Sequence, residues 1–384
     1  MAQTIKPSRF FAGDSVIWAV VFLLALFSIL VVYSATGTLA YKRLSGDTEY
    51  YLFKHTILVL FSLVAMWICH QIDYKYYSRI SRYTLLFSVP LLIFTWQYGT
   101  TINDATRWVT VPYINQTFQP SDLAKLALIA NMASMLSKRQ QSIKEFQRAI
   151  LPILLWCGVT CGLIGLSDLS GAIILFATCM LLLFIGRVPV RYLFALVLVG
   201  VLAGTFALVV GQRAGTAKSR ISAYLNQDKI SFQAEQSYIA IATGGVFGKG
   251  PGNSDQRNFL PHPYSDFIFA VIVEEYGIFG AILVIVLYLT LLYRGMMTVS
   301  KSESAFGGLL SAGLSFSLVI QAMINMGVAV GVLPITGLQL PLLSMGGTSL
   351  LFTGVSIGIM ISVSKSEDTF VATETGIRKK RIAK

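Results

Sequence analysis

Ten runs of apolar residues, most of them long enough to cross a lipid bilayer, constrain this sequence more than any other feature. A spanning helix takes about 20 apolar residues. Only 12% of the 384 residues are charged and 55% are hydrophobic, so polar groups cannot cover a soluble surface. We expect an all-α integral membrane protein of about ten transmembrane helices, which excludes a soluble enzyme or a disulfide framework. The runs lie at about 15–35, 51–69, 83–98, 121–137, 149–166, 170–186, 192–212, 267–293, 306–330 and 347–364.

Lysine and arginine fall mainly on one side of this predicted topology. The flanks and loops on the side of the N-terminus hold 19 of them, whereas the short loops of the other side hold only Lys42, Arg43 and Arg107. Positive loops stay in the cytoplasm, so we predict that both termini are cytoplasmic and that residues 365–384 are a basic cytoplasmic tail. We expect residues 1–384 to form a single membrane domain. The net charge of +12 then needs no nucleic acid partner.

One segment, residues 213–265 between the seventh and eighth runs, is much longer than the other connections. We expect it to be a large external loop, and loops of this length are usually functional. Its residues 244–252 contain five glycines but lack the Lys-Ser/Thr ending of a phosphate-binding loop. The glycines more plausibly turn the chain sharply or let backbone amides approach a ligand.

A first polar cluster precedes and enters the fourth run. Pro120 suits the first turn of a helix, Ser121 or Asp122 suits its N-cap, and Lys125 follows one turn later. Two interpretations stay open at this point. Asp122 and Lys125 either neutralise each other locally, or Lys125 and Arg107 form a cationic site for an anionic substrate.

A second polar cluster lies where the long loop meets the eighth run. Asp266 either caps that helix or acts as a carboxylate base at the rim of a cavity. Glu274 and Glu275 lie about 12 Å deeper along the helix axis, where we expect them to hydrogen-bond within the bundle. Two prolines and several glycines in 331–349 predict a broken segment that lines a cavity.

The four cysteines lie in apolar runs, and no histidine or carboxylate accompanies them at metal-ligand spacing. Cys157 and Cys161 share a helix face, but we interpret them as small buried hydrophobic residues. Asp168 occupies the short loop between the fifth and sixth runs, apart from other charges in the sequence.

These clusters, in this order, resemble the SEDS family of membrane-embedded peptidoglycan glycosyltransferases, and the resemblance covers nearly the whole chain. Each motif is weak alone, but their agreement along a ten-span topology is specific. The matching positions are Tyr33-Ser34-Ala35, Arg107-Trp108, Gln119-Pro120-Ser121, Ala124-Lys125, Asp168, Arg220-Ile221, Gln236-Ser237, Gly244-Gly245, Gly248-Lys249-Gly250, Gln256, Leu260-Pro261, Asp266 to Ala270, Glu274-Glu275, Gly277, Pro334, Thr336-Gly337, Ser344, Gly346-Gly347 and Ser349.

The resemblance implies an enzyme that polymerises lipid II on the outer face of the bacterial cytoplasmic membrane. It implies Asp266 as the general base. The residues expected to bind substrate are Arg107, Gln119, Lys125, Arg220, Gln236, Lys249 and Ser349, and the expected structural polar residues are Asp122, Asp168, Glu274 and Glu275. No cofactor is certain, and assistance by Mg²⁺ or Mn²⁺ stays open.

The resemblance also implies partners and a place in the cell. The partners are lipid II, undecaprenyl pyrophosphate, a class B penicillin-binding transpeptidase and other membrane proteins of cell division. The place is the division septum, where the enzyme would make septal cell wall. Asp122 stands where the family usually has Glu, and residues 262–265 depart from a usual Glu-x-His-Thr, so no role for that Glu or His is carried over. A lipid II flippase, the elongation member of the family and a docking scaffold remain alternatives.

Overall fold

The computed structural model describes most of the chain: residues 11–37, 48–102, 105–111, 116–210, 215, 219, 220, 222, 224, 231–302 and 304–382. Several charges used for the orientation lie outside the described residues, namely Lys6, Arg9, Lys42, Arg43 and Lys384, as do Arg213, Lys218 and Lys229 of the predicted external loop. Side chains beyond Lys365 are likewise outside the description.

A helix occupies each of the ten apolar runs. The helices are α1 (Ser15–Ala35), α3 (Thr48–Gln71), α4 (Tyr74–Tyr98), α5 (Pro120–Lys138), α6 (Leu151–Ser167), α7 (Leu169–Ile185), α8 (Val190–Val210), α11 (Ile268–Lys301), α12 (Ala305–Ala329) and α13 (Gly347–Ile382). Within the described residues, six of them are long and apolar enough to cross a membrane, counting α6 with the π-helical turn Phe146–Ile150 before it and α13 to Lys365. Shorter apolar stretches follow in α7 and α8. A count of ten spans stays a prediction.

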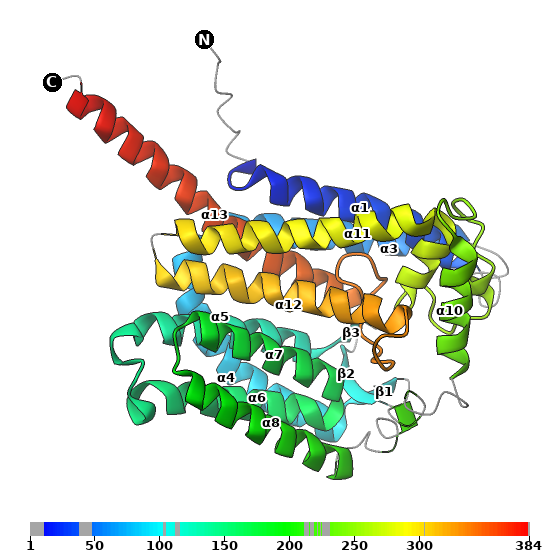
Figure 1. The fold of residues 1–384 in the computed structure, drawn as a ribbon, viewed down its shortest axis with the longest axis horizontal. Coiled ribbons are helices and arrows are strands. Elements are labelled where there is room, and N and C mark those ends of the chain that lie inside the picture. Colours follow the sequence, from blue (N-terminus) through cyan, green and yellow to red (C-terminus); the bar gives the residue numbers. More distant parts are fainter. Residues whose placement is uncertain are drawn as a thin grey trace.

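Successive long helices run in opposite directions, so both termini lie at one end of the bundle (Figure 1). We call this the terminal end. The opposite, distal end holds a small sheet, the helix α10 (Phe232–Gly244) and the segment 331–346. The long segment between α8 and α11 is therefore partly helical. Which end faces the cytoplasm stays a prediction.

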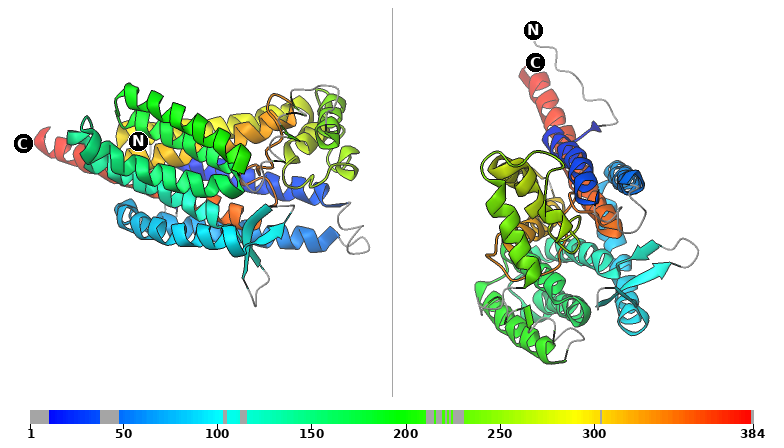
Figure 2. Two further views of the ribbon diagram at one scale, coloured as in Figure 1. Left: turned by 90° about the horizontal axis from the view of Figure 1, so that it is seen from below. Right: turned by 90° about the vertical axis from the view of Figure 1, so that its right-hand side faces the viewer.

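The sheet has three antiparallel strands in chain order: β1 (Thr100–Ile102), β2 (Ala105–Val111) and β3 (Gln116–Phe118). It projects beside α4, with which β2 is in contact (Figure 2). Val109 pairs with Phe118, which brings the chain back to the start of α5. The sheet thus places Arg107, in β2, close to the bundle.

Small residues allow a close helix crossing between α13 and α3. A Cβ added at Gly354 or Gly358 would lie 2.3 Å from the backbone oxygen of Ser62 or Met66. The Gly-x-x-x-Gly spacing therefore lets the two backbones meet, as in many membrane helix pairs. The Ser62 hydroxyl also donates to the backbone oxygen of Leu350 over 2.6 Å.

Helix starts agree in part with the prediction. Pro120 occupies the first turn of α5 as expected, but the N-cap is Gln119, without a side-chain cap bond. The prediction of Ser121 or Asp122 as the cap was wrong, because both lie inside the first turn, where their backbone is already helical.

Candidate functional site

Asp266 lies at the distal end, directly before α11. The N-cap of that helix is Phe267, so the capping interpretation of Asp266 was wrong. The Asp266 side chain is half-buried, and its Oδ1 accepts a hydrogen bond of 2.8 Å from the Ser265 hydroxyl. Its position leaves the carboxylate to interact with groups outside α11.

The backbone around Asp266 is held by the irregular segment 331–346. Asn325 Nδ2 donates both to the backbone oxygen of Asp266, over 2.8 Å, and to that of Leu338, over 2.6 Å. The Ser344 hydroxyl donates over 2.6 Å to the backbone oxygen of Ser265. The segment predicted to be broken therefore fixes the residue predicted to be the base.

Arg220 and Asp266 both approach one glycine of this same segment. Gly337 has φ +70°, and a Cβ there would lie 3.5 Å from Asp266 Oδ2 and 4.0 Å from both Nη atoms of Arg220. Arg220 also donates from Nη1 to the backbone oxygen of Thr336 over 3.2 Å. The structure thus gathers a carboxylate and a guanidinium around a site that has no side chain of its own.

A second charged cluster lies where β2 meets the starts of α5 and α7. Arg107 Nη1 is 3.4 Å from Asp168 Oδ2, and Asp168 Oδ1 accepts the backbone N–H of Gly171 as the N-cap of α7. Asp168 is 4% exposed, so its charge needs such partners. The sequence showed Asp168 apart from other charges because its partner is 61 residues away.

Lys125 belongs to the same cluster. Its Nζ is 3.2 Å from Asp122 Oδ1, and a Cβ at Gly171 would lie 3.3 Å from Lys125 Nζ and 2.6 Å from Asp168 Oδ2. Two cations therefore face two carboxylates, and the local Asp122–Lys125 pair left open above is formed. The cluster is nearly neutral, which reduces its attraction for an anion.

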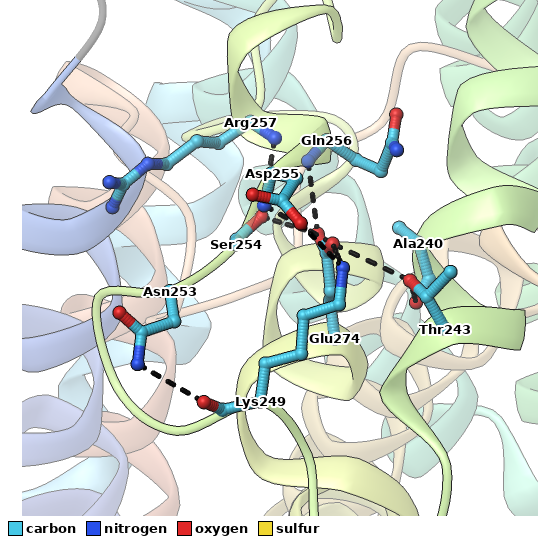
Figure 3. A network of polar contacts seen from close by, with 9 residues as sticks. All are labelled: Ala240, Thr243, Lys249, Asn253, Ser254, Asp255, Gln256, Arg257 and Glu274. Atoms are coloured by element: carbon cyan, nitrogen blue, oxygen red, sulfur yellow. Dashed lines mark hydrogen bonds and ion pairs between the residues drawn. The ribbon is translucent and has the colours of Figure 1, made fainter.

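Lys249 lies in a network with Glu274 rather than in an open basic site (Figure 3). Its Nζ is 2.7 Å from Glu274 Oε1 and 2.9 Å from Asp255 Oδ2. These hydrogen bonds, that with Glu274 first, raise the pKa of Lys249 above its ordinary value. Glu274, which is fully buried, also accepts from the Ser254 hydroxyl and from the backbone N–H groups of Asp255 and Gln256.

The glycine-rich loop lies against α11 through direct backbone contact. The N–H groups of Lys249 and Gly250 donate to the backbone oxygens of Glu274 and Glu275, each over 2.9 Å. Gly277 has φ +65°, and a Cβ there would lie 2.3 Å from the backbone oxygen of Val246. The glycines thus let the loop pack backbone against backbone on α11, a use that the sequence analysis did not predict.

Glu275 joins α11 to α1, through residues to which the sequence analysis gave no role. The Ser34 hydroxyl donates to Glu275 Oε1, and Arg257 Nη1 donates to both the hydroxyl and the backbone oxygen of Ser34, each over 3.0 Å. Ser34 was one of the family-like positions, so the resemblance pointed to it without a role.

Three other predicted substrate residues, Gln119, Gln236 and Ser349, have different surroundings. Gln119 is 8% exposed and donates from Nε2 to the Ser121 hydroxyl over 2.9 Å. Gln236 and Ser349 are half-buried in α10 and α13. Among the described residues, none of these three side chains hydrogen-bonds to the Asp266 side chain.

A third cysteine joins the two that share a face. The sulfur atoms of Cys157, Cys161 and Cys179 lie within 4.8 Å of one another, in α6 and α7. In the described part of the chain, this is the one group of three His, Cys, Asp or Glu side chains with ligand atoms this close. All three cysteines are free thiols.

A family model described as "Cell cycle protein", covering FtsW, RodA and SpoVE, matches residues 14–369. The chain belongs to this family. It is 34% identical over 359 residues to the "Probable peptidoglycan glycosyltransferase FtsW" of Geobacter sp. strain M18, covering 91% of this chain and 96% of the relative. It is 31% identical over 363 residues to stage V sporulation protein E of Bacillus subtilis, covering 92% and 97%.

Solved structures of FtsW/RodA/SpoVE-like chains have the same fold. One, from work titled "Structural coordination of polymerization and crosslinking by a peptidoglycan synthase complex", matches with a TM-score of 0.69 at 27% identity, covering 93% of this chain and 98% of the other. A mutant of the rod shape determining protein RodA of Thermus thermophilus matches with a TM-score of 0.67 at 25% identity, with the same coverage.

Proposed function

We propose that this chain is a peptidoglycan glycosyltransferase that polymerises lipid II, with Asp266 as its general base. The names of the FtsW relatives support the activity. One observation carries the assignment of the base: Asp266 Oδ2 and the Arg220 guanidinium both lie close to Gly337. A polymerase of this kind needs a base for the attacking hydroxyl and a cation near the departing diphosphate, and this juxtaposition offers both.

The proposed step is a displacement at one carbon. Asp266 accepts the proton of the acceptor's GlcNAc 4-hydroxyl as that oxygen attacks the anomeric carbon of the donor MurNAc. The bond from that carbon to the undecaprenyl pyrophosphate breaks, and the diphosphate leaves with the electron pair. Attack from the opposite face inverts the configuration. The proton then passes from Asp266 to water, which restores the carboxylate for the next acceptor.

The neighbours of Asp266 have positioning roles in this proposal. The Ser265 hydroxyl, at 2.8 Å from Oδ1, orients the carboxylate and leaves Oδ2 on the side of Gly337 and Arg220. Asn325 holds the backbone on both sides of the site. Among the described cations, Arg220 is the best placed for the departing diphosphate, whereas Lys125 and Lys249 already face carboxylates.

We also propose a role for a divalent metal ion at this site. Mg²⁺ and Mn²⁺ take carboxylate and phosphate oxygens. In the described residues no group of three acidic or histidine ligands surrounds Asp266. Asp266 alone fits a metal ion that is held jointly by its carboxylate and by the phosphates of the substrate. Such an ion would offset the charge of the phosphates.

The cellular setting is proposed from the relatives. The FtsW names favour septal synthesis over elongation, although RodA has a similar fold. The synthase complex among the structural matches supports a class B penicillin-binding transpeptidase as partner. In this proposal the distal end faces the outside of the cytoplasmic membrane, the basic terminal end faces the cytoplasm, and other division membrane proteins contact the bundle.

The decisive experiment is polymerisation of purified lipid II by the protein in detergent or nanodiscs, alone and with its transpeptidase. Asp266→Asn is expected to lower the rate by about 10²-fold or more, because loss of a general base costs this much. Glu49→Gln, an exposed carboxylate at the start of α3, is the matched control and should polymerise normally. Full polymerisation by Asp266→Asn contradicts the proposal, and transport of labelled lipid II without polymer favours the flippase.

A further inference from the structure

A basic cavity of about 280 Å³ lies at the terminal end, far along the helices from Asp266. It is formed by the first turns of α4 and the last residue of α5, and its lining residues are Lys75, Ser78, Arg79, Arg82, Tyr83 and Lys138. Four of these six side chains are cations, two carry hydroxyls and none is acidic. The proposed glycosyl transfer does not use this cavity.

The cations of α4 lie close enough together to repel one another. Lys75 and Arg79 are four residues apart, and Arg79 and Arg82 are three apart, so they are neighbours on one helix face. Like charges at such spacing repel each other and destabilise a helix. Among the described residues, none of the four cations of the cavity forms an ion pair. An anion in the cavity would remove this repulsion.

The polar wall of the cavity is fixed by contacts between the two helices. Lys138 Nζ donates to the Ser78 hydroxyl over 3.1 Å, and the hydroxyls of Ser78 and Ser134 lie 2.6 Å apart. The cation from α5 is thereby held toward the cations of α4. These bonds make a preformed site that joins the two helices.

An apolar surface continues from the cavity along the outside of α4. Ile80 is 45% exposed, Tyr83 66% and Phe87 63%, and all three lie within one to three turns of the cavity residues. A ligand that fits both features carries phosphate at one end and hydrocarbon at the other. Free phosphate uses only the first feature, so the apolar surface selects the lipid.

We propose that this cavity binds the phosphate headgroup of an anionic membrane lipid, with the acyl chains along α4. Basic pockets between transmembrane helices bind such headgroups. Arginine suits phosphate because its planar group makes two parallel hydrogen bonds. Four cations accommodate two phosphates, so a diphosphatidyl lipid of the cardiolipin class binds more tightly than a lipid with one phosphate. The bound headgroup then links α4 to α5.

The test compares lipid binding by two variants that lose the same charge at the same end. Arg79→Gln/Arg82→Gln removes two cations of the cavity. Lys144→Gln/Arg148→Gln removes two exposed cations of the terminal end that do not line it. Each protein is purified, delipidated and titrated with cardiolipin, phosphatidylglycerol or phosphatidylethanolamine, and bound lipid is counted by native mass spectrometry.

The cavity variant is expected to bind cardiolipin at least ten-fold more weakly than the wild type, whereas the control variant stays within two-fold. Equal loss in both variants, or equal binding in all three proteins, overturns the proposal. Inorganic phosphate and pyrophosphate are added as competitors. If either displaces cardiolipin completely at equal concentration, the cavity is a free phosphate site and the lipid assignment is wrong. Because this test does not measure polymerisation, its failure does not contradict the proposed enzyme activity.

Discussion

Lys249 Nζ and Glu274 Oε1 lie 2.7 Å apart, and this pair joins the glycine-rich loop to α11 eight residues after Asp266. Glu274 is fully buried, whereas the Lys249 side chain is 28% exposed. The pair therefore lies at the boundary between the loop and the bundle. It is the contact through which the loop can hold the start of α11, and with it Asp266, in place.

Glu274→Gln is expected to lower the free energy of unfolding by about 2–3 kcal/mol, because it leaves the Lys249 ammonium without its buried partner. Thermal unfolding of the purified protein in detergent measures this. Glu145→Gln removes a carboxylate that is 53% exposed and pairs with Arg148 at the surface. That control should change stability by less than about 0.5 kcal/mol. Equal effects of the two substitutions would mean that the buried pair does not stabilise the fold.

The same pair predicts a dependence of stability on pH. Its hydrogen bonds raise the pKa of Lys249 in the folded protein. The contribution is therefore fully present below the unfolded lysine pKa of about 10.4 and is lost as pH rises through the higher folded value. Melting temperatures measured from pH 8 to 11.5 should fall more steeply above pH 10.4 in the wild type than in Lys249→Met. Parallel curves would contradict the assignment.

Much of the fold was predictable from local sequence. Each apolar run became a helix, because a run of this length satisfies its own backbone hydrogen bonds in a membrane. The broken character of 331–346 followed from its prolines and glycines, and the position of Asp266 just before a helix followed from the apolar run after it. These features depend on residues that are close in the chain.

The partners of the site were not predictable in this way. Arg107 contacts Asp168, and Arg257 contacts Ser34, only because segments distant in sequence pack together. Cys179 joined Cys157 for the same reason. Lys249 was expected to face substrate, but the structure places it beside Glu274; its spacing from that residue, 25 positions, carries no periodic signal.

Arg107 and Asp168 supply a test of the second charged cluster. Arg107→Ala and Asp168→Ala are each expected to destabilise the protein, and the double variant by less than their sum, because the two side chains interact. A coupling of about 1–3 kcal/mol is expected for charges in contact and largely buried. Unfolding of all four proteins gives this value. Additive effects would show that the pair contributes nothing to stability.

Lys125→Ala separates a structural from a substrate role for the same cluster. If Lys125 contacts the diphosphate, the KM for lipid II rises several-fold while the protein yield and melting temperature change little. If it serves only Asp122, at 3.2 Å, yield and activity fall together. Asp122→Asn is the matched variant, because it breaks the same pair and keeps the lysine. A KM effect confined to Lys125→Ala supports the substrate role.

Gly337→Ala tests the proposed site without touching a charged residue. The new Cβ would lie 3.5 Å from Asp266 Oδ2 and 4.0 Å from the Arg220 guanidinium nitrogens, in the space where the acceptor hydroxyl and the diphosphate would have to meet.

Gly252→Ala is the control, because Gly252 also has positive φ, +81°, but nothing lies within 4 Å of its added Cβ. Both substitutions strain the backbone by about 1–2 kcal/mol, so both melting temperatures should fall alike. Only Gly337→Ala should lose polymerisation, by about 10-fold or more, since misplacing reacting groups by about 1 Å is costly. Equal activity of the two variants would remove Gly337, and the Asp266–Arg220 juxtaposition around it, from the reaction.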